Sequence, residues 1–179
     1  MNYYADVILP LPLQGTFTYE LSKKEYENLG IGHRVAVSFG KRKVYTGVIK
    51  EIHTNKPTLY ETKPIEFIYD KEELISESQI DFWSWISKYY FTPIGDVLKA
   101  AIPSTFLLES ETIIIKKEIN SHDIDQMTDD EYLIYEALDF KTLKINEVSD
   151  ILDKKNTYSV IQKMILKGFI ELNFEINEK

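Results

Sequence analysis

The sequence predicts an α+β protein, with a small, curved, antiparallel β-barrel-like domain that carries two helices, followed by a winged-helix domain. Two observations lead to this fold class. Between residues 3 and 68, short runs alternate apolar and polar side chains and are separated by proline or glycine turns, as in a small curled sheet. From residue 76 onward, apolar residues recur every three or four positions, which is typical of amphipathic helices. The expected boundaries are 1–104 for the β domain, 105–127 for a connector and 128–179 for the winged helix.

The strands expected in the first domain are residues 3–9, 16–21, 35–39, 44–52 and 63–68. Pro10 and Pro12 lack a backbone N–H, so the first strand must leave the sheet or lie at its edge there. Gly40 opens a hairpin turn whose next three residues are all cations, namely Lys41, Arg42 and Lys43. The sheet therefore carries a strongly basic turn between its third and fourth strands.

Two helices are expected to complete the first domain. Ser76 and Gln79 have the spacing of a capping box, and the helix that follows them ends before Pro93. Residues 94–101 form the second, shorter helix. We expect both helices to close the open side of the sheet with large aromatic side chains, namely Trp83, Trp85, Tyr89 and Tyr90.

The second domain has the element order of a winged helix. Thr128 and Glu131 form a capping box before a first helix, and two more helices and an alternating strand at 170–176 follow. Three helices followed by a β ribbon characterise this variant of the helix-turn-helix. Its third helix would enter the major groove of DNA, where the possible contacts are Lys154, Lys155, Asn156, Ser159 and Lys163. Because residues 128–179 carry a net charge of −4, packing against protein is an equally open alternative.

Composition and charge exclude several classes of protein. The 179 residues contain no cysteine, which excludes a thiolate nucleophile, a cysteine zinc site and disulfides within this chain. No apolar run approaches the roughly 20 residues that span a bilayer, and the N-terminus lacks a signal-peptide pattern, so we expect a cytoplasmic protein without a membrane partner. The net charge of −8 is unevenly spread, since residues 1–63 carry +3 and residues 64–127 carry −7. Phosphate attraction is screened over about 10 Å, so a nucleic-acid site belongs in the first third.

Motifs for catalysis and for cofactors are not found. The sequence has neither a phosphate-binding loop nor a dinucleotide-binding glycine motif. His33, His53 and His122 lie far apart and do not have the spacing of metal ligands. Asp129 and Asp130 fall in the first turn of an expected helix, where carboxylates favour the positive end of the helix dipole. We therefore expect no catalytic site, metal or cofactor in this chain.

The basic turn has two interpretations. Lysines on a hairpin often only keep a sheet edge from pairing with other chains. The functional interpretation is a phosphate-binding cluster formed by Arg34, Lys41, Arg42 and Lys43. Aromatic residues of the same third can offer stacking faces beside it, namely Phe17, Tyr19, Tyr45 and Tyr60. Cations for the backbone and flat rings for the bases are what a single strand of DNA, or its end, requires.

Four sequence runs resemble the family of primosomal protein N′, the PriA replication-restart helicases. They are residues 6–13 (DVILPLPL), 16–19 (TFTY), 32–41 (GHRVAVSFGK) and 89–97 (YYFTPIGDV). The resemblance implies a bacterial, nucleoid-associated protein of which this chain is an N-terminal fragment. It implies a domain that binds the 3′ end of the nascent leading strand at stalled forks, followed by a winged helix. It also implies ATP-dependent helicase lobes and a zinc region further along, and partners that include branched DNA, single-stranded DNA-binding protein and other primosome proteins.

The resemblance also implies a pocket for the strand end. The family's pocket residues correspond to Phe17, Thr18, Gly40 and Lys63 of this chain. Position 18 departs from the pattern, because Thr18 stands where the family has an acidic residue. A hydroxyl still accepts a hydrogen bond from a terminal 3′-OH, although a carboxylate accepts one about twice as strongly.

A second function from another class is a protein-interaction module that recruits replication or repair proteins. It would consist of a small β domain followed by an acidic winged helix. Salt distinguishes the two, since binding to phosphates weakens steeply as salt rises and an apolar protein contact does not.

Overall fold

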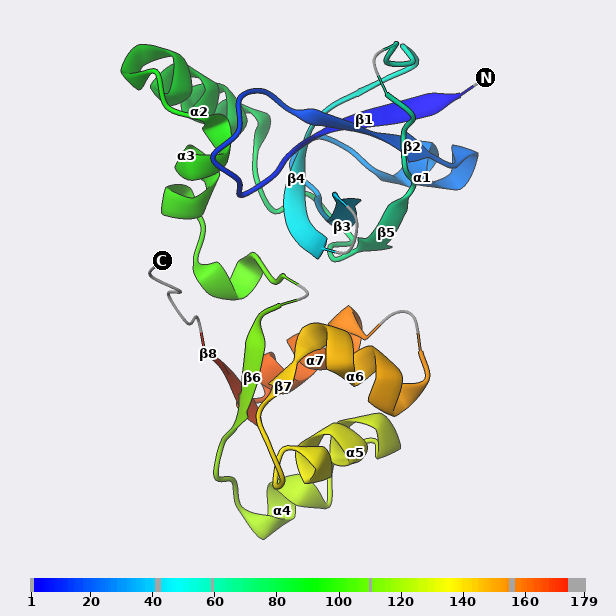
Figure 1. The fold of residues 1–179 in the computed structure, drawn as a ribbon, viewed down its shortest axis with the longest axis vertical. Coiled ribbons are helices and arrows are strands. Elements are labelled where there is room, and N and C mark those ends of the chain that lie inside the picture. The colour runs from blue at the N-terminus through cyan, green and yellow to red at the C-terminus, as the bar shows by residue number, and fades with distance from the viewer. Residues whose placement is uncertain (1, 41–42, 59, 110, 155–156, 174–179) are drawn as a thin grey trace. The chain divides into compact units, whose positions relative to one another are not determined.

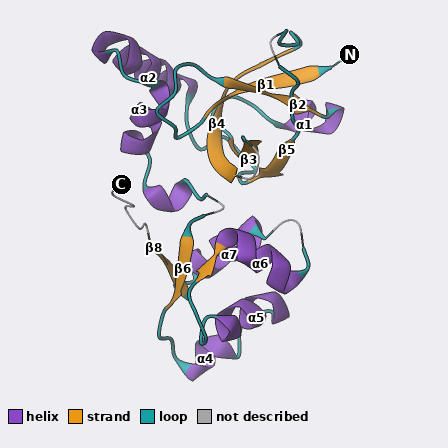
Figure 2. Ribbon diagram, viewed as in Figure 1, coloured by secondary structure: helices purple, strands orange, loops and turns teal. Residues whose placement is uncertain are grey.

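The fold was analysed in a computed structural model that describes residues 2–40, 43–58, 60–109, 111–154 and 157–173. The chain divides into two compact units, Met1–Leu108 and Glu109–Lys179. Each unit has its own sheet and its own helices, and each is described by itself (Figures 1 and 2). The predicted α+β class is confirmed, as is a curved antiparallel sheet in the first unit.

In the described residues of the first unit, five antiparallel strands form one sheet in the order β2-β1-β4-β3-β5. The strands are β1 (Tyr3–Ile8), β2 (Phe17–Leu21), β3 (Arg34–Phe39), β4 (Lys43–His53) and β5 (Ile65–Ile68). The first half of the long β4 pairs with β3 and its second half pairs with β1. The register of the β1–β4 pair shifts after Asp6, where a bulge bends the strands. The sheet therefore curls, and a bridge from Glu20 to Pro64 brings its two edges together.

The hollow side of the curled sheet is filled by apolar side chains from all five strands. The buried ones are Ala5, Val7, Leu9, Tyr19, Leu21, Leu29, Val35, Val37, Tyr45, Ile49 and Ile65. They follow the alternation seen in the sequence, since Tyr19 and Leu21 are buried and the intervening Glu20 is exposed. Phe17 and Phe39 are partly buried at the same cluster, so the aromatic end of the hollow is left partly open.

Two helices, α2 (Glu77–Tyr90) and α3 (Ile94–Ala101), cover the outer face of this sheet, followed by a short 3-10 turn, η1, at Ser104–Phe106. The short helix α1 (Lys23–Asn28) instead lies against β1 and β2, and Leu29 at its C-terminal end belongs to the core of the hollow side. The predicted capping box of α2 is present, because the Ser76 hydroxyl accepts from the Gln79 amide and the Gln79 side chain accepts from the Ser76 amide. Trp83 of α2 and Leu98 of α3 pack in a second core with Ile8 and Val48 from the back of the sheet.

The predicted role of the α2 aromatics is mostly wrong. Trp83 is 5% exposed and does seal the sheet, but Trp85, Tyr89 and Tyr90 are between 54% and 67% exposed. The cause is helical geometry, because the buried Ile80 and Trp83 define one face of α2 and these three rings lie away from it.

Gly95 allows the N-terminus of α3 to lie against residues 9–11, since a Cβ there would lie 2.2 Å from the Leu11 carbonyl oxygen.

In the described residues of the second unit, a three-stranded sheet in the order β7-β6-β8 packs with helices. The elements are β6 (Ile113–Lys116), α4 (Ser121–Ile124), α5 (Asp129–Ala137), β7 (Leu143–Lys144), α6 (Ile145–Leu152), α7 (Tyr158–Leu166) and β8 (Ile170–Asn173). The capping box predicted for Thr128 and Glu131 is present at the start of α5. Ile114, Ile134, Val148 and Ile161 are fully buried and form the centre of the unit.

Residues 105–127 are not a connector, contrary to the prediction. Residues 105–108 belong to the first unit and residues 109–127 to the second. The reason is the apolar run at Ile113–Ile115, which forms the central strand β6 and hydrogen-bonds to both β7 and β8.

Among the described residues, none of the helices is long and apolar enough to cross a membrane.

Candidate nucleic-acid interface

A pocket of about 290 Å³ opens at the aromatic end of the curled sheet. Its lining comes from the start of β2, the end of β3 and the segment before β5, and consists of Phe17, Thr18, Tyr19, Ser38, Phe39, Gly40, Tyr60, Glu61 and Lys63. The four residues predicted for binding a strand end, Phe17, Thr18, Gly40 and Lys63, all lie in this lining. Ligand pockets begin at about 300 Å³, so the space suits one nucleotide-sized group.

The edge of β2 determines the shape of this pocket. An edge strand has backbone N–H groups without a partner strand. Two outward N–H groups of β2 are satisfied by the segment before β5, because Thr18 donates to the Tyr60 hydroxyl at 3.0 Å and Glu20 donates to the Lys63 carbonyl at 2.8 Å. These bonds hold residues 60–63 along β2 and form one wall of the pocket.

A hydrogen bond between Lys63 and Gly40 links the segment before β5 to the end of β3. The ammonium Nζ of Lys63 donates to the carbonyl oxygen of Gly40 at 2.8 Å. Gly40 has a positive φ of 68°, which a side chain would strain, although a Cβ there would meet no atom within 4 Å. The glycine is therefore needed for the backbone conformation of the turn and leaves open space beside the lysine.

Aromatic rings line the inner end of the pocket. Phe17 is half-buried and packs edge-on against Phe39, with 4.7 Å between ring centroids. Tyr19 is buried, and its hydroxyl donates to the Ser38 carbonyl at 3.1 Å. Burial raises the pKa of the Tyr19 phenol well above its ordinary value, with a smaller contribution from nearby Tyr60. Tyr19 is therefore a neutral hydrogen-bond donor whose role is to support the pocket.

A carboxylate lies next to Thr18 although position 18 itself is not acidic. Asp6 faces Thr18 across the β1–β2 pair, and the Thr18 hydroxyl donates to Asp6 Oδ1 at 2.7 Å. His53 Nε2 lies 3.3 Å from the same oxygen, and its Nδ1 accepts from the Asn55 amide, which places the ring proton on Nε2. Sequence reasoning missed Asp6, and the signal that points to it is the register of two neighbouring strands.

The prediction that Arg34 binds phosphate is wrong. Arg34 is 3% exposed, and its guanidinium donates to both carboxylate oxygens of Asp70, at 2.9 and 2.6 Å. It also donates to the Phe106 carbonyl at 3.1 Å, with its carbon 4.7 Å from the Phe106 ring centroid. Its charge is thus neutralised inside the unit, where it ties β3 to the chain that follows β5 and α3.

Of the other three cations predicted to bind phosphate, the structure describes only Lys43. Lys43 is exposed at the start of β4, opposite Phe39 in the hairpin register. Lys41 and Arg42 lie outside the described residues. Lys43 therefore lies directly across from Phe39, which lines the pocket. Phosphate binding by Lys41, Arg42 and Lys43 stays a prediction.

The predicted DNA contacts of the second unit are only partly described. Lys155 and Asn156 lie outside the described residues. Lys154 donates to Asp130 at 2.5 Å, so its charge is paired at the start of α5. Ser159 is half-buried and Lys163 is exposed one turn further along α7.

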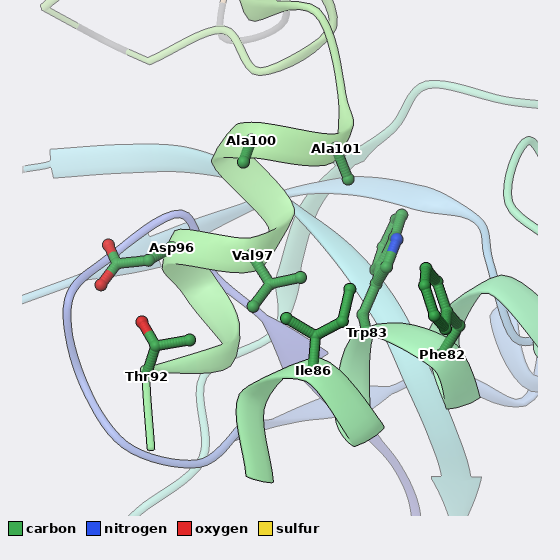
Figure 3. Close-up of a pocket in the computed structure, with 8 residues that line it drawn as sticks. All are labelled: Phe82, Trp83, Ile86, Thr92, Asp96, Val97, Ala100 and Ala101. Carbon is green, nitrogen blue, oxygen red and sulfur yellow. The ribbon is translucent and has the colours of Figure 1, made fainter. Parts of the chain in front are cut away.

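A second hollow, of about 400 Å³, lies between α2 and α3. Figure 3 shows Phe82, Trp83 and Ile86 of α2 facing Val97, Ala100 and Ala101 of α3, with Asp96 at the rim. Beside it runs an exposed aromatic row on α2, formed by Phe82, Trp85, Tyr89 and Tyr90. Successive rings of this row lie 5.9, 5.1 and 4.9 Å apart.

Among the residues that the structure describes, no group of three or more histidine, aspartate or glutamate side chains is placed to hold a metal ion.

Comparison with known proteins identifies the family. A model described as the 3′DNA-binding domain (3′BD) of PriA matches residues 6–103, which include the curled sheet, the pocket and helices α2 and α3. The chain therefore belongs to the PriA family of replication restart proteins.

Named relatives agree with this assignment. The chain is 31% identical over 97% of its length to the replication restart protein PriA of Buchnera aphidicola subsp. Acyrthosiphon pisum, covering 25% of that protein. It is 32% identical over 56% of its length to the PriA of Chlamydia pneumoniae, covering 13% of it. It is 25% identical over 93% of its length to the PriA of Rickettsia prowazekii, covering 23% of it. The chain thus spans a quarter or less of the length of these relatives.

Proposed function

We propose that this chain binds DNA at stalled replication forks and holds the 3′ end of the nascent leading strand in the pocket of the first unit. The observation that carries the proposal is the convergence of Phe17, Thr18, Gly40 and Lys63, from three separate segments, on one pocket of nucleotide size. The match of residues 6–103 to a 3′DNA-binding domain also supports it.

The chemistry of the lining suits a strand end. Lys63 supplies a positive charge at the mouth, and the exposed Lys43 supplies another on the neighbouring hairpin, for the backbone phosphates. The Thr18 hydroxyl donates its proton to Asp6, so its oxygen is left as an acceptor for the terminal 3′-OH. Strand interiors have no such hydroxyl, which is the basis of end selectivity.

The wider context of the whole protein is part of the same proposal. The second unit acts as a winged helix, with α7 as the element that approaches DNA or a protein partner. The longer protein is an ATP-dependent helicase with a zinc region, and it acts in the bacterial cytoplasm on the nucleoid for primosome assembly. The three helices α5, α6 and α7 followed by β8 support the winged-helix assignment.

Fork DNA with defined strand ends tests the proposal. We expect the chain to bind forks with a free 3′-OH on the nascent strand more tightly than forks whose 3′ end is blocked by a phosphate. Phe17→Ala should weaken binding to the free end by about 1–3 kcal/mol, the range for one lost stack, and should affect blunt duplex little. Fluorescence titration measures both affinities.

Phe140→Ala is the matched control, since Phe140 is 86% exposed in the second unit. Thermal unfolding followed by circular dichroism shows whether Phe17→Ala remains folded. Equal losses on free-ended and blunt DNA contradict the pocket's role.

A protein-interaction module is the second candidate, and the aromatic row of α2 favours it. Four large rings on the surface of one helix, next to an apolar hollow, are typical of a protein-binding surface. Single-stranded DNA-binding protein and other primosome proteins are the partners we propose for it. The two functions use different surfaces, so both can belong to one chain.

A further inference from the structure

Tyr60 is the most exposed aromatic residue of the pocket lining. Its side chain is 46% exposed, whereas Phe17 and Phe39 are half-buried and Tyr19 is 4% exposed. The pattern of the family pocket does not include this position, and sequence reasoning only counted its ring among several possible stacking faces. What Tyr60 contributes follows from the contact that its hydroxyl makes.

That contact anchors the ring at its far end. The Tyr60 hydroxyl accepts the N–H of Thr18 at 3.0 Å, so the side chain reaches from the segment before β5 to the edge of β2. Both residues line the pocket. Because its hydroxyl is already hydrogen-bonded, the Tyr60 side chain loses little conformational freedom when a base stacks on its ring, which lowers the entropic cost of binding.

Phe17 is less suited to be the main stacking surface. It packs 4.7 Å from Phe39 at an interplanar angle of 68° and contributes to the core of the unit. Because Phe39 already covers part of the Phe17 ring, Phe17 has less ring surface left for a base to stack on. Tyr60 instead combines an open ring with a hydrogen bond to the pocket wall.

We infer that Tyr60 is the principal stacking platform for the terminal base and that its bond to the Thr18 amide holds the ring in position. The inference rests on the proposed function, because the ligand is the 3′-terminal nucleotide of a DNA strand. The Tyr60 ring supplies the larger stacking surface for the base, Phe17 stacks on it over a smaller area at the inner end beside Phe39, and Lys63 contacts the phosphate. Stacking is tolerant of sequence, so the pocket accepts any of the four bases.

The test uses the full 179-residue chain and two forks. One fork ends its nascent strand in an ordinary 3′ nucleotide, and the other ends in an abasic sugar that keeps the 3′-OH. Tyr60→Ala should weaken binding to the first fork about tenfold, within the range for one lost base stack. It should leave binding to the abasic fork unchanged, because that end has no base to lose.

Tyr60→Phe separates the ring from its anchor. The ring remains while the bond to the Thr18 amide is lost, so we expect a loss of about threefold, which is typical of one neutral hydrogen bond. Tyr132→Ala is the matched control, because Tyr132 is also 46% exposed but lies in the second unit. It should change neither affinity.

Three results overturn the inference, and they are distinguishable. Tyr60→Ala that weakens both forks equally, or neither, removes the stacking role, while a wild-type preference for free 3′ ends leaves the proposed function standing. Wild-type chain that binds free and blocked ends equally overturns both. A loss with Tyr60→Phe as large as with Tyr60→Ala shows that the hydroxyl alone matters and also overturns the platform.

Discussion

At the scale of single residues, Arg34 and Lys43 show how position decides the role of a cation. Both are close to the basic hairpin in the sequence. Arg34 is buried and bonded to Asp70 and to the Phe106 carbonyl, whereas Lys43 is exposed at the start of β4. A buried charge needs its partners to offset desolvation, so the guanidinium belongs to the fold and only the exposed lysine is available to phosphate.

Arg34→Met should therefore affect stability and not binding. We expect the free energy of unfolding to fall by about 3–5 kcal/mol, because the carboxylate of Asp70 is left without its partner inside the unit. Urea denaturation measures this loss. Lys43→Met is the matched control and should change stability by less than about 0.5 kcal/mol while weakening DNA binding. A stable Arg34→Met variant with weakened DNA binding contradicts the structural role.

At the scale of elements, Glu131 joins two helices of the second unit. It is 1% exposed, completes the capping box at the start of α5, and accepts from Lys167 at 2.7 and 2.8 Å beyond the end of α7. Burial acts to raise its pKa, but the hydrogen bonds and the charge of Lys167 and the Thr128 amide together hold the pKa of Glu131 below its ordinary value. The ionised carboxylate is thus the form that stabilises the fold.

The sign of the pH dependence follows from this shift. The unfolded chain binds the proton at the ordinary Glu pKa, so the stabilisation is present above that pKa and is lost as pH falls through the lower folded pKa. Glu131→Gln should lower the free energy of unfolding by about 1–3 kcal/mol at pH 7 and by less at pH 3. Denaturation followed by far-ultraviolet circular dichroism measures the two values.

Glu136→Gln is the matched control for this helix, since Glu136 is exposed on α5. It should change stability little at either pH. A deficit in Glu131→Gln that stays the same from pH 7 to pH 3 shows that the loss comes from packing and not from the charge.

At the scale of the whole molecule, the net charge of −8 gives little information about a local DNA site. The pocket presents Lys63 beside the basic hairpin, while the acidic residues are concentrated in later parts of the chain. Fields from distant charges are screened within about 10 Å, so the potential at the pocket depends mainly on nearby charges such as Lys63. The aromatic row of α2 is a different, uncharged surface, so we expect any binding there to depend less on salt.

Salt should separate the two surfaces. Binding of a strand end that neutralises two or three phosphates should weaken with a slope of about −1.5 to −2 in log affinity against log salt. Trp85→Ala, in the aromatic row, should leave this slope and the affinity for DNA unchanged. Fluorescence anisotropy at several salt concentrations measures both. A flat salt dependence, or loss of DNA binding in Trp85→Ala, contradicts the pocket as the DNA site.

Local sequence patterns predicted most helices and strands of the first unit and the start of one helix of the second. The alternating runs match β1 to β5, the capping boxes at Ser76 and Thr128 are present, and α3 has the predicted bounds of 94–101. These features depend on neighbours within a few residues, which a sequence displays directly. The apolar run at 113–115 was visible as well, but its partners were not, so its place as a central strand was missed.

The sequence by itself determined the family, the five strands and two longer helices of the first unit, and four residues that meet in one pocket. Only the tertiary structure decided that Arg34 is buried against Asp70, that Asp6 supplies a carboxylate to Thr18, and that Tyr60 closes the pocket. The physical reason is distance along the chain. Asp6 and Thr18 are 12 residues apart, Arg34 and Asp70 36, and Thr18 and Tyr60 42, so each contact exists only once the strands have paired and the unit has folded.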